Sequence, residues 1–212
     1  MPLTRRRAAA AAALALLLPA CASSLPDLVE VPQPVADAAA GRVILFTGLN
    51  WFGESYRGTG TDALAQRIRA AGVPASIYTP GAWEKAAEAV LQLTPRPAAL
   101  AVYGYSAGGS AAVRFARRLG EAGIAIETLV LLEAWNAAEI PCTVRLAIQY
   151  RLEPGNAMTA ARPGCTRLVE ALIDDRQAGR ASPLGHLTVA VETEVLDLLA
   201  SQLLQDGQVR RR

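Results

Sequence analysis

Residues 98–108 of the 212-residue chain read A-A-L-A-V-Y-G-Y-S-A-G and give the clearest indication of its fold. Its opening run is short and apolar, which is typical of a strand buried on both faces of a parallel sheet. The run leads into a G-x-S-x-G frame, with Ser106 between Gly104 and Gly108. A sharp strand-to-helix turn can expose a serine hydroxyl at its tip, and glycines are needed where neighbouring backbone packs too closely for side chains. Five letters alone are a weak signal, so the context decides.

The rest of the chain alternates short apolar runs with segments of helical period. The predicted strands are residues 42–47, 73–78, 98–103, 124–132 and 144–150, and the predicted helices are 62–71, 82–93, 107–119, 168–174 and 190–204. Strands that alternate with helices predict a three-layer α/β/α sandwich around a mostly parallel sheet of about five to six strands. In such sheets ligands bind at the carboxyl ends of the strands, so the loops there are the places to seek chemistry.

One glycine motif points to a cofactor and is set aside. Residues 58–63, G-T-G-T-D-A, fit the loose dinucleotide pattern G-x-G-x-x-A. They lie well past the end of the first strand, however. Dinucleotide binding also requires an acidic residue near the end of the next strand, and none stands there. With one histidine and no C-x-x-C, the chain also lacks a metal-site pattern. We therefore expect neither a cofactor nor a metal.

The residues needed to activate a serine are present in a suitable order. A serine hydroxyl needs a base, and the base needs a third group that fixes its tautomer. The only histidine, His186, stands in a loop ahead of the last predicted helix. The acid should lie between serine and histidine in the chain. Glu133 closes the strand predicted at 124–132 and is the preferred acid, and Glu153, after the next strand, is the alternative.

Backbone N–H groups near Ser106 are candidates to stabilise the negative charge that develops on a carbonyl oxygen when a serine attacks it. The N–H of Ala107 follows the serine at a helix N-terminus, where the helix dipole favours an anion. A second N–H is expected from the loop after the first strand, from Leu49 or alternatively Asn50. Trp51 and Tyr105 are the candidates for contact with a substrate.

The N-terminus has the features of an export signal. Three arginines precede an apolar run that is too short to span a bilayer, so residues 1–20 predict a signal peptide. L-P-A-C at 18–21 resembles a bacterial lipobox, which implies that Cys21 becomes a lipidated N-terminus in the periplasmic or outer membrane. An ordinary signal peptide, giving a soluble periplasmic or secreted protein, is the alternative. The proline-rich residues 21–40 predict an extended tether.

The net charge of the predicted domain argues against nucleic acid as a partner. The net charge is +2, but three arginines fall in the signal and three in a predicted basic tail, residues 207–212. The single domain expected at 41–206 is then near neutral, which argues against nucleic-acid binding. The oligomeric state is not predicted.

Two cysteines remain in the predicted domain, Cys142 and Cys165. Both stand beside proline or glycine, which places them in loops. In an oxidising compartment two such thiols tend to pair, so we expect a disulfide, with free thiols as the alternative.

Taken together, these motifs resemble the α/β-hydrolase superfamily over most of residues 41–204. The resemblance rests on the turn at 104–108, the loop at 48–50 and the order Ser106, acid, His186, and it is closest to small members without a lid. It implies a serine hydrolase that acts on esters or thioesters of small-molecule or lipid-like acyl groups. The chain departs from the usual pattern by having glutamate in place of aspartate and few strands after the turn.

Two other functions are compatible with the same residues. The fold can serve as a non-catalytic binding or scaffolding domain of an envelope lipoprotein, since one fold hosts many functions. The same residues also permit hydrolysis of amides or peptides.

Overall fold

The computed structural model describes residues 28–30, 41–49, 59–135, 139–155, 157–173 and 184–209. Within these ranges the elements are, in chain order, β1 (Leu28–Glu30), β2 (Arg42–Phe46), α1 (Gly60–Ala70), β3 (Ala75–Tyr78), the 3-10 turn η1 (Pro80–Ala82), α2 (Trp83–Leu91), β4 (Leu100–Tyr105), α3 (Ala107–Glu121), β5 (Ile126–Leu132), β6 (Glu139–Ile140), β7 (Val144–Arg151), β8 (Thr159–Ala160), β9 (Arg167–Leu172), α4 (His186–Val189) and α5 (Thr193–Gln205).

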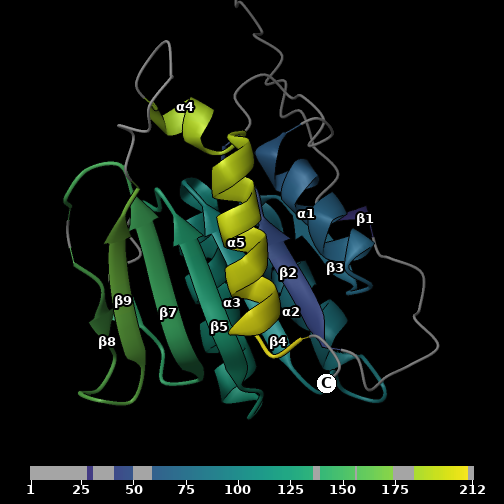
Figure 1. Cartoon of the computed structure of the whole chain (residues 1–212). Helices are drawn as coiled ribbons and strands as arrows, with labels where there is room; N and C mark the ends of the chain where they lie inside the picture. Colours follow the sequence, from purple (N-terminus) through teal and green to yellow (C-terminus); the bar gives the residue numbers. More distant parts are fainter. Residues whose placement is uncertain are drawn as a thin grey trace, which may run out of the picture.

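A seven-stranded sheet in the order β1-β3-β2-β4-β5-β7-β9 forms the centre of the domain (Figure 1). Only β1 is antiparallel to its neighbour, and the other six strands are parallel. The short strands β6 and β8 form a separate parallel pair. The chain moves from β2 outward to β3 and then returns to the other side of β2 as β4. That reversal of strand order marks the point where parallel sheets of this kind bind ligands.

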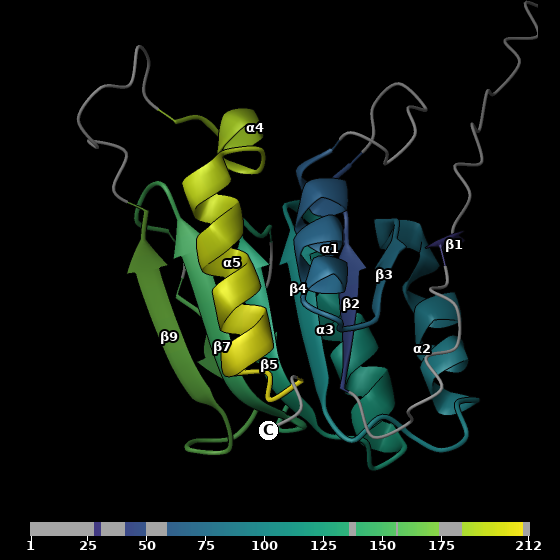
Figure 2. The same cartoon turned by 45° about the vertical axis from the view of Figure 1, so that its right-hand side comes forward.

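Alternate side chains of the sheet enter two separate cores. On β2, Val43 and Leu45 join the core beneath α1 and α5, while Ile44 and Phe46 join the core beneath α2 and α3. Figure 1 looks onto the α1–α5 layer, and Figure 2 shows α2 and α3 behind the sheet. Burial on both faces explains why these strands are continuously apolar in sequence. The predicted three-layer, mostly parallel architecture is confirmed.

The prediction of a helix at 168–174 is wrong. Arg167–Leu172 is strand β9, which pairs in parallel with β7. Its apolar residues pack on both layers, with Leu168 against the α2–α3 core and Val169 and Ala171 against the α1–α5 core. The free edge of β7 supplies backbone partners, and such tertiary pairing overrides a weak local preference.

Boundaries near the expected site also differ. Strand β4 continues two residues beyond the predicted end, to Tyr105, so Ser106 follows the strand directly. The sequence predicts that the last helix begins at Ala190, but α5 begins at Thr193, and His186–Val189 forms the separate short helix α4.

The dinucleotide-like motif is the start of a helix. The Thr59 side chain caps α1 by accepting a hydrogen bond from the Asp62 N–H at 3.3 Å. A Cβ at Gly60 would overlap the Ala190 carbonyl group, so this glycine is explained by packing between α1 and the segment that joins α4 to α5. Gly58 lies outside the described residues.

Both ends of the described chain contact the sheet. Strand β1 falls within the predicted tether and pairs with β3. Past the expected end of the domain at 206, Val209 is buried, and a Cβ at Gly41 would overlap it. The predicted signal peptide, Cys21 and the arginines of 210–212 lie outside the described residues. None of the helices that the structure describes is both long enough and apolar enough to cross a membrane.

The predicted disulfide between Cys142 and Cys165 is confirmed, with the two Cα atoms 5.1 Å apart. The cysteines precede β7 and β9 respectively, so the bond ties together the amino ends of two parallel neighbours. This edge of the sheet lies opposite the carboxyl ends where ligands bind.

Replacing both cysteines with serine is expected to lower the free energy of unfolding by about 3 kcal/mol, the loop-closure value for a loop of this length. Urea unfolding of the double variant and of the wild-type protein measures the difference. Reduction of the wild-type protein should shift its urea midpoint in the same direction. Identical midpoints with and without reductant would contradict a stabilising role.

Candidate active site

Ser106 sits on a strained turn between β4 and α3. It has φ 53° and ψ −121°, a backbone conformation that is costly for a residue with a side chain. Three backbone hydrogen bonds hold it there. The Ser106 N–H donates to the Leu132 carbonyl at 3.0 Å, and the Ser106 carbonyl accepts from Gly109 at 3.0 Å and from Trp135 at 3.1 Å. These bonds fix the direction of the serine side chain.

The glycines around the serine are required by close backbone contacts. A Cβ at Gly104 would lie 2.6 Å from the Gly108 carbonyl oxygen. A Cβ at Gly108 would overlap the carbonyl oxygens of Phe46, the last residue of β2, and of Thr47, which follows it. The turn therefore packs directly onto the neighbouring strand, as the sequence motif predicted.

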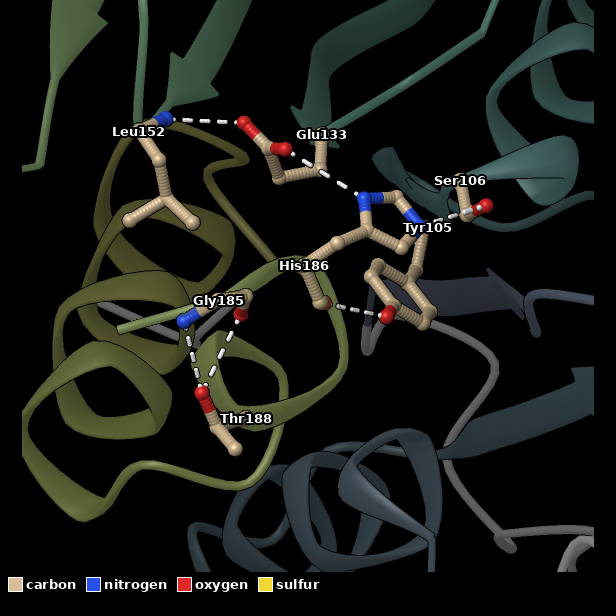
Figure 3. A network of polar contacts seen from close by, with 7 residues as sticks. All are labelled: Tyr105, Ser106, Glu133, Leu152, Gly185, His186 and Thr188. Carbon is tan, nitrogen blue, oxygen red and sulfur yellow. Dashed lines mark hydrogen bonds and ion pairs between the residues drawn. The ribbon is translucent and has the colours of Figure 1, made fainter. Parts of the chain in front are cut away.

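Ser106, His186 and Glu133 form a continuous chain of polar contacts (Figure 3). The His186 Nε2 atom lies 3.0 Å from Ser106 Oγ, and Nδ1 lies 3.3 Å from Glu133 Oε2. An ionised carboxylate can only accept hydrogen bonds, so Nδ1 carries the proton when the ring is neutral and Nε2 accepts from the serine hydroxyl. In such an arrangement a histidine can act as a base towards the serine, and a carboxylate can fix the histidine tautomer.

Glu133 is positioned by its backbone and by β7. It follows β5 with φ 46°, and its N–H donates to the Tyr150 carbonyl at 2.9 Å. The second carboxylate oxygen accepts from the Leu152 N–H at 2.7 Å, which leaves the first oxygen for His186. The alternative acid, Glu153, is exposed, and none of the contacts among the described residues joins it to His186.

Tyr105, predicted as a substrate contact, is engaged with His186. Its ring stacks on the imidazole with the centroids 5.3 Å apart, and its hydroxyl donates to the His186 carbonyl at 2.6 Å (Figure 3). Burial raises the pKa of the Tyr105 hydroxyl to about 12, and the nearby Glu133 carboxylate acts in the same direction. The phenol therefore stays protonated and able to donate at physiological pH.

Trp135 is a site residue that sequence reasoning missed. Its ring stacks on His186 with the centroids 5.9 Å apart, yet 45% of the residue is exposed. Besides its N–H bond to Ser106, its carbonyl accepts from the Ser110 hydroxyl at 2.7 Å. The sequence feature that could have identified it is its position, two residues after Glu133 and close to the carboxyl end of a predicted strand.

The expected oxyanion donors lie in two places. Ala107 is the first residue of α3, and N–H groups in the first turn of a helix have no intrahelical partner. The loop after β2 runs beside the serine, because a Cβ at Gly48 would lie 2.9 Å from the Tyr105 ring and 3.5 Å from Ser106 Cβ. Leu49 follows in that loop and is exposed. Asn50 and Trp51 lie outside the described residues.

No grouping of three or more metal-ligating side chains occurs in the described part of the chain.

No protein-family model and no curated protein sequence matches the chain. Solved structures do match it. A dienelactone hydrolase from Anabaena variabilis is 19% identical with a TM-score of 0.51, covering 87% of this chain and 96% of its own. The carboxylesterase EstE1 from a metagenomic library is 15% identical with a TM-score of 0.50, covering 81% and 82%. The NocB thioesterase domain, solved as a covalent fluorophosphonate complex, is 14% identical with a TM-score of 0.50, covering 80% and 95%. The chain therefore has the α/β-hydrolase fold.

Replacing Tyr105 with phenylalanine tests its link to His186. The loss of one hydrogen bond is expected to lower the free energy of unfolding at pH 7 by about 1 kcal/mol. Because folding raises the pKa of this phenol from 10 to about 12, its stabilising contribution is full below pH 10 and is lost as the pH rises towards 12. Urea unfolding between pH 7 and 12 should show a shallower decline for the variant. Parallel curves for variant and wild type would contradict the assignment.

Proposed function

We propose that the protein is an exported serine hydrolase that cleaves carboxylic esters or thioesters through an acyl-enzyme intermediate. The single observation that carries the proposal is the continuous array from Ser106 through His186 to Glu133 at the carboxyl edge of the sheet. The α/β-hydrolase fold supports it, and so do the esterase and thioesterase activities named for proteins of similar structure.

In the first half-reaction the Ser106 hydroxyl attacks the acyl carbonyl carbon. His186 Nε2 takes the hydroxyl proton as the new C–O bond forms, and the Glu133 carboxylate stabilises the resulting imidazolium through Nδ1. The tetrahedral intermediate then collapses, the bond to the leaving group breaks, and the proton on Nε2 passes to the departing alcohol or thiol.

Negative charge on the carbonyl oxygen requires donors that are already in place. The Ala107 N–H at the start of α3 supplies one, and a backbone N–H of the β2 loop, from Leu49 or Asn50, supplies the other. Each such donor is worth about 3 to 4 kcal/mol of transition-state stabilisation. In the second half-reaction water attacks the acyl-enzyme, with His186 again acting first as base and then as acid. No cofactor takes part in these steps.

Two exposed apolar residues beside the array support the proposed substrate class. Trp135 contacts His186 and is partly exposed, and Leu49 is exposed after β2. Both favour an apolar acyl group, either on a small molecule or on a lipid. Amide hydrolysis uses the same chemistry with a poorer leaving group, and an assay of matched ester, thioester and amide substrates separates these activities.

Export and lipid anchoring belong to the same proposal. The signal sequence and lipobox-like L-P-A-C predict delivery to the cell envelope and acylation of Cys21. The disulfide between Cys142 and Cys165 supports an oxidising compartment. Two or more acyl chains would hold the protein firmly on a membrane surface.

Treatment of the folded protein with a fluorophosphonate is expected to label Ser106 alone, because only an activated serine hydroxyl reacts readily. Peptide mapping by mass spectrometry identifies the modified residue. Ser106→Ala should abolish labelling, and Ser110→Ala, on the next turn of α3, should retain it. Absence of labelling on folded wild-type protein, or labelling of another residue, would refute the proposal.

The choice of acid gives a second test. Glu133→Gln is expected to slow labelling by a factor of about 10³ or more, since an amide cannot stabilise the imidazolium and favours the wrong tautomer. Glu153→Gln is the matched control and should label at the wild-type rate. Equal effects of the two substitutions, or a larger effect at 153, would reverse the assignment.

A further inference from the structure

Large apolar side chains are exposed mainly at one edge of the domain. Among the described residues, six large hydrophobic side chains are exposed, and five of them lie at the carboxyl ends of the strands or in α4 and the residue pair after it. Their exposed fractions run from 45% to 77%. We call these five the apolar edge: Leu49, Trp135, Leu172, Leu187 and Val191. The sixth, Leu198, is on α5.

Three residues of this edge lie beside the candidate active site. Trp135 stacks on His186, Leu187 is the next residue in α4, and Leu49 follows β2 beside the turn that carries Ser106. Figures 1 and 2 both show α4 at the end of the sheet towards which the parallel strands point. Clustered exposed apolar residues mark an interaction surface, whereas isolated ones do not.

The N-terminal chain enters the sheet at the same edge. Strand β1 runs antiparallel to β3, and Leu28 pairs with Tyr78, the last residue of β3. Only seven residue steps separate Leu28 from Cys21. Even fully extended, they span at most about 25 Å. The six-residue strand β4 is itself about 20 Å long, so contact by the opposite edge would use most of the tether's length, whereas the carboxyl edge can contact the bilayer directly.

We propose that the apolar edge docks on the surface of the lipid bilayer in which Cys21 is anchored. The proposal rests on the lipid anchoring proposed above. Exposed tryptophan and leucine side chains favour the interfacial region of a bilayer, where apolar groups insert by about 5 to 10 Å. The anchor makes the contact intramolecular, so a small apolar patch suffices to orient the domain. Ser106 then opens towards acyl groups that the membrane presents.

Quenching of Trp135 by brominated lipids tests this orientation. The mature lipoprotein is reconstituted into vesicles of phosphatidylethanolamine and phosphatidylglycerol, with or without bromine on the upper acyl chain. With Trp51 and Trp83 replaced by phenylalanine, the fluorescence of Trp135 should fall about twofold in the brominated vesicles. The matched control keeps only Trp83, which packs against the α2–α3 core, and should be quenched much less.

A second variant covers the case in which the single-tryptophan proteins fail to fold. Leu187→Ser with Val191→Ser should lower hydrolysis of an ester carried in the vesicle about tenfold and leave labelling of Ser106 by a soluble fluorophosphonate unchanged. Leu198→Ser, which removes the exposed leucine outside the apolar edge, should change neither rate.

Several results would overturn the proposal. Unquenched Trp135 in vesicle-bound protein would show that the edge faces water. Loss of soluble-probe labelling in the Leu187 and Val191 variant would assign these residues to a small-substrate pocket instead, and a dimer that buries them would assign them to a second copy. An unacylated Cys21 would remove the tether. Labelling of wild-type Ser106 is independent of all these outcomes, so failure here leaves the proposed hydrolase function intact.

Discussion

The contact of the Ser106 turn with β2 positions the other parts of the site. Gly108 approaches the carbonyl groups of Phe46 and Thr47 so closely that any side chain there would displace the strand. That approach brings the β2 loop beside the serine and directs the N-terminus of α3 towards the same point. The strained backbone of Ser106, with φ 53°, persists because the contacts on both sides leave it no alternative.

The acid and the serine belong to one hydrogen-bonded unit, and the histidine is added to it from a distant part of the chain. Strand β5 binds the Ser106 N–H through Leu132, and the residues that follow return to Ser106 through Trp135. His186 comes from α4, far along the sequence, and is held between its polar partners by the stacked ring and hydroxyl of Tyr105. The partly exposed ring of Trp135 stacks on His186 beside this assembly.

The sequence predicted the layers and the polar array because both follow from local patterns. Apolar runs between helical segments indicate a parallel sheet, and the glycine spacing around Ser106 indicates a tight turn. The position of Glu133 at a strand end was also visible, but the choice over Glu153 depends on how β5 and β7 align, which only the fold supplies. The edge strand β9 and the stacking of Trp135 on His186 were missed because both arise from long-range contacts.

We propose that Ser106, His186 and Glu133 act as one unit. A double-mutant cycle measures this most directly, with the rate of fluorophosphonate labelling of Ser106 recorded for His186→Ala, Glu133→Gln and the double variant. Residues that act as a unit are strongly non-additive, so the double variant should label within about twofold of His186→Ala alone. A double variant slowed by the product of the two single effects would contradict the claim, because Glu133 would then act independently of the histidine.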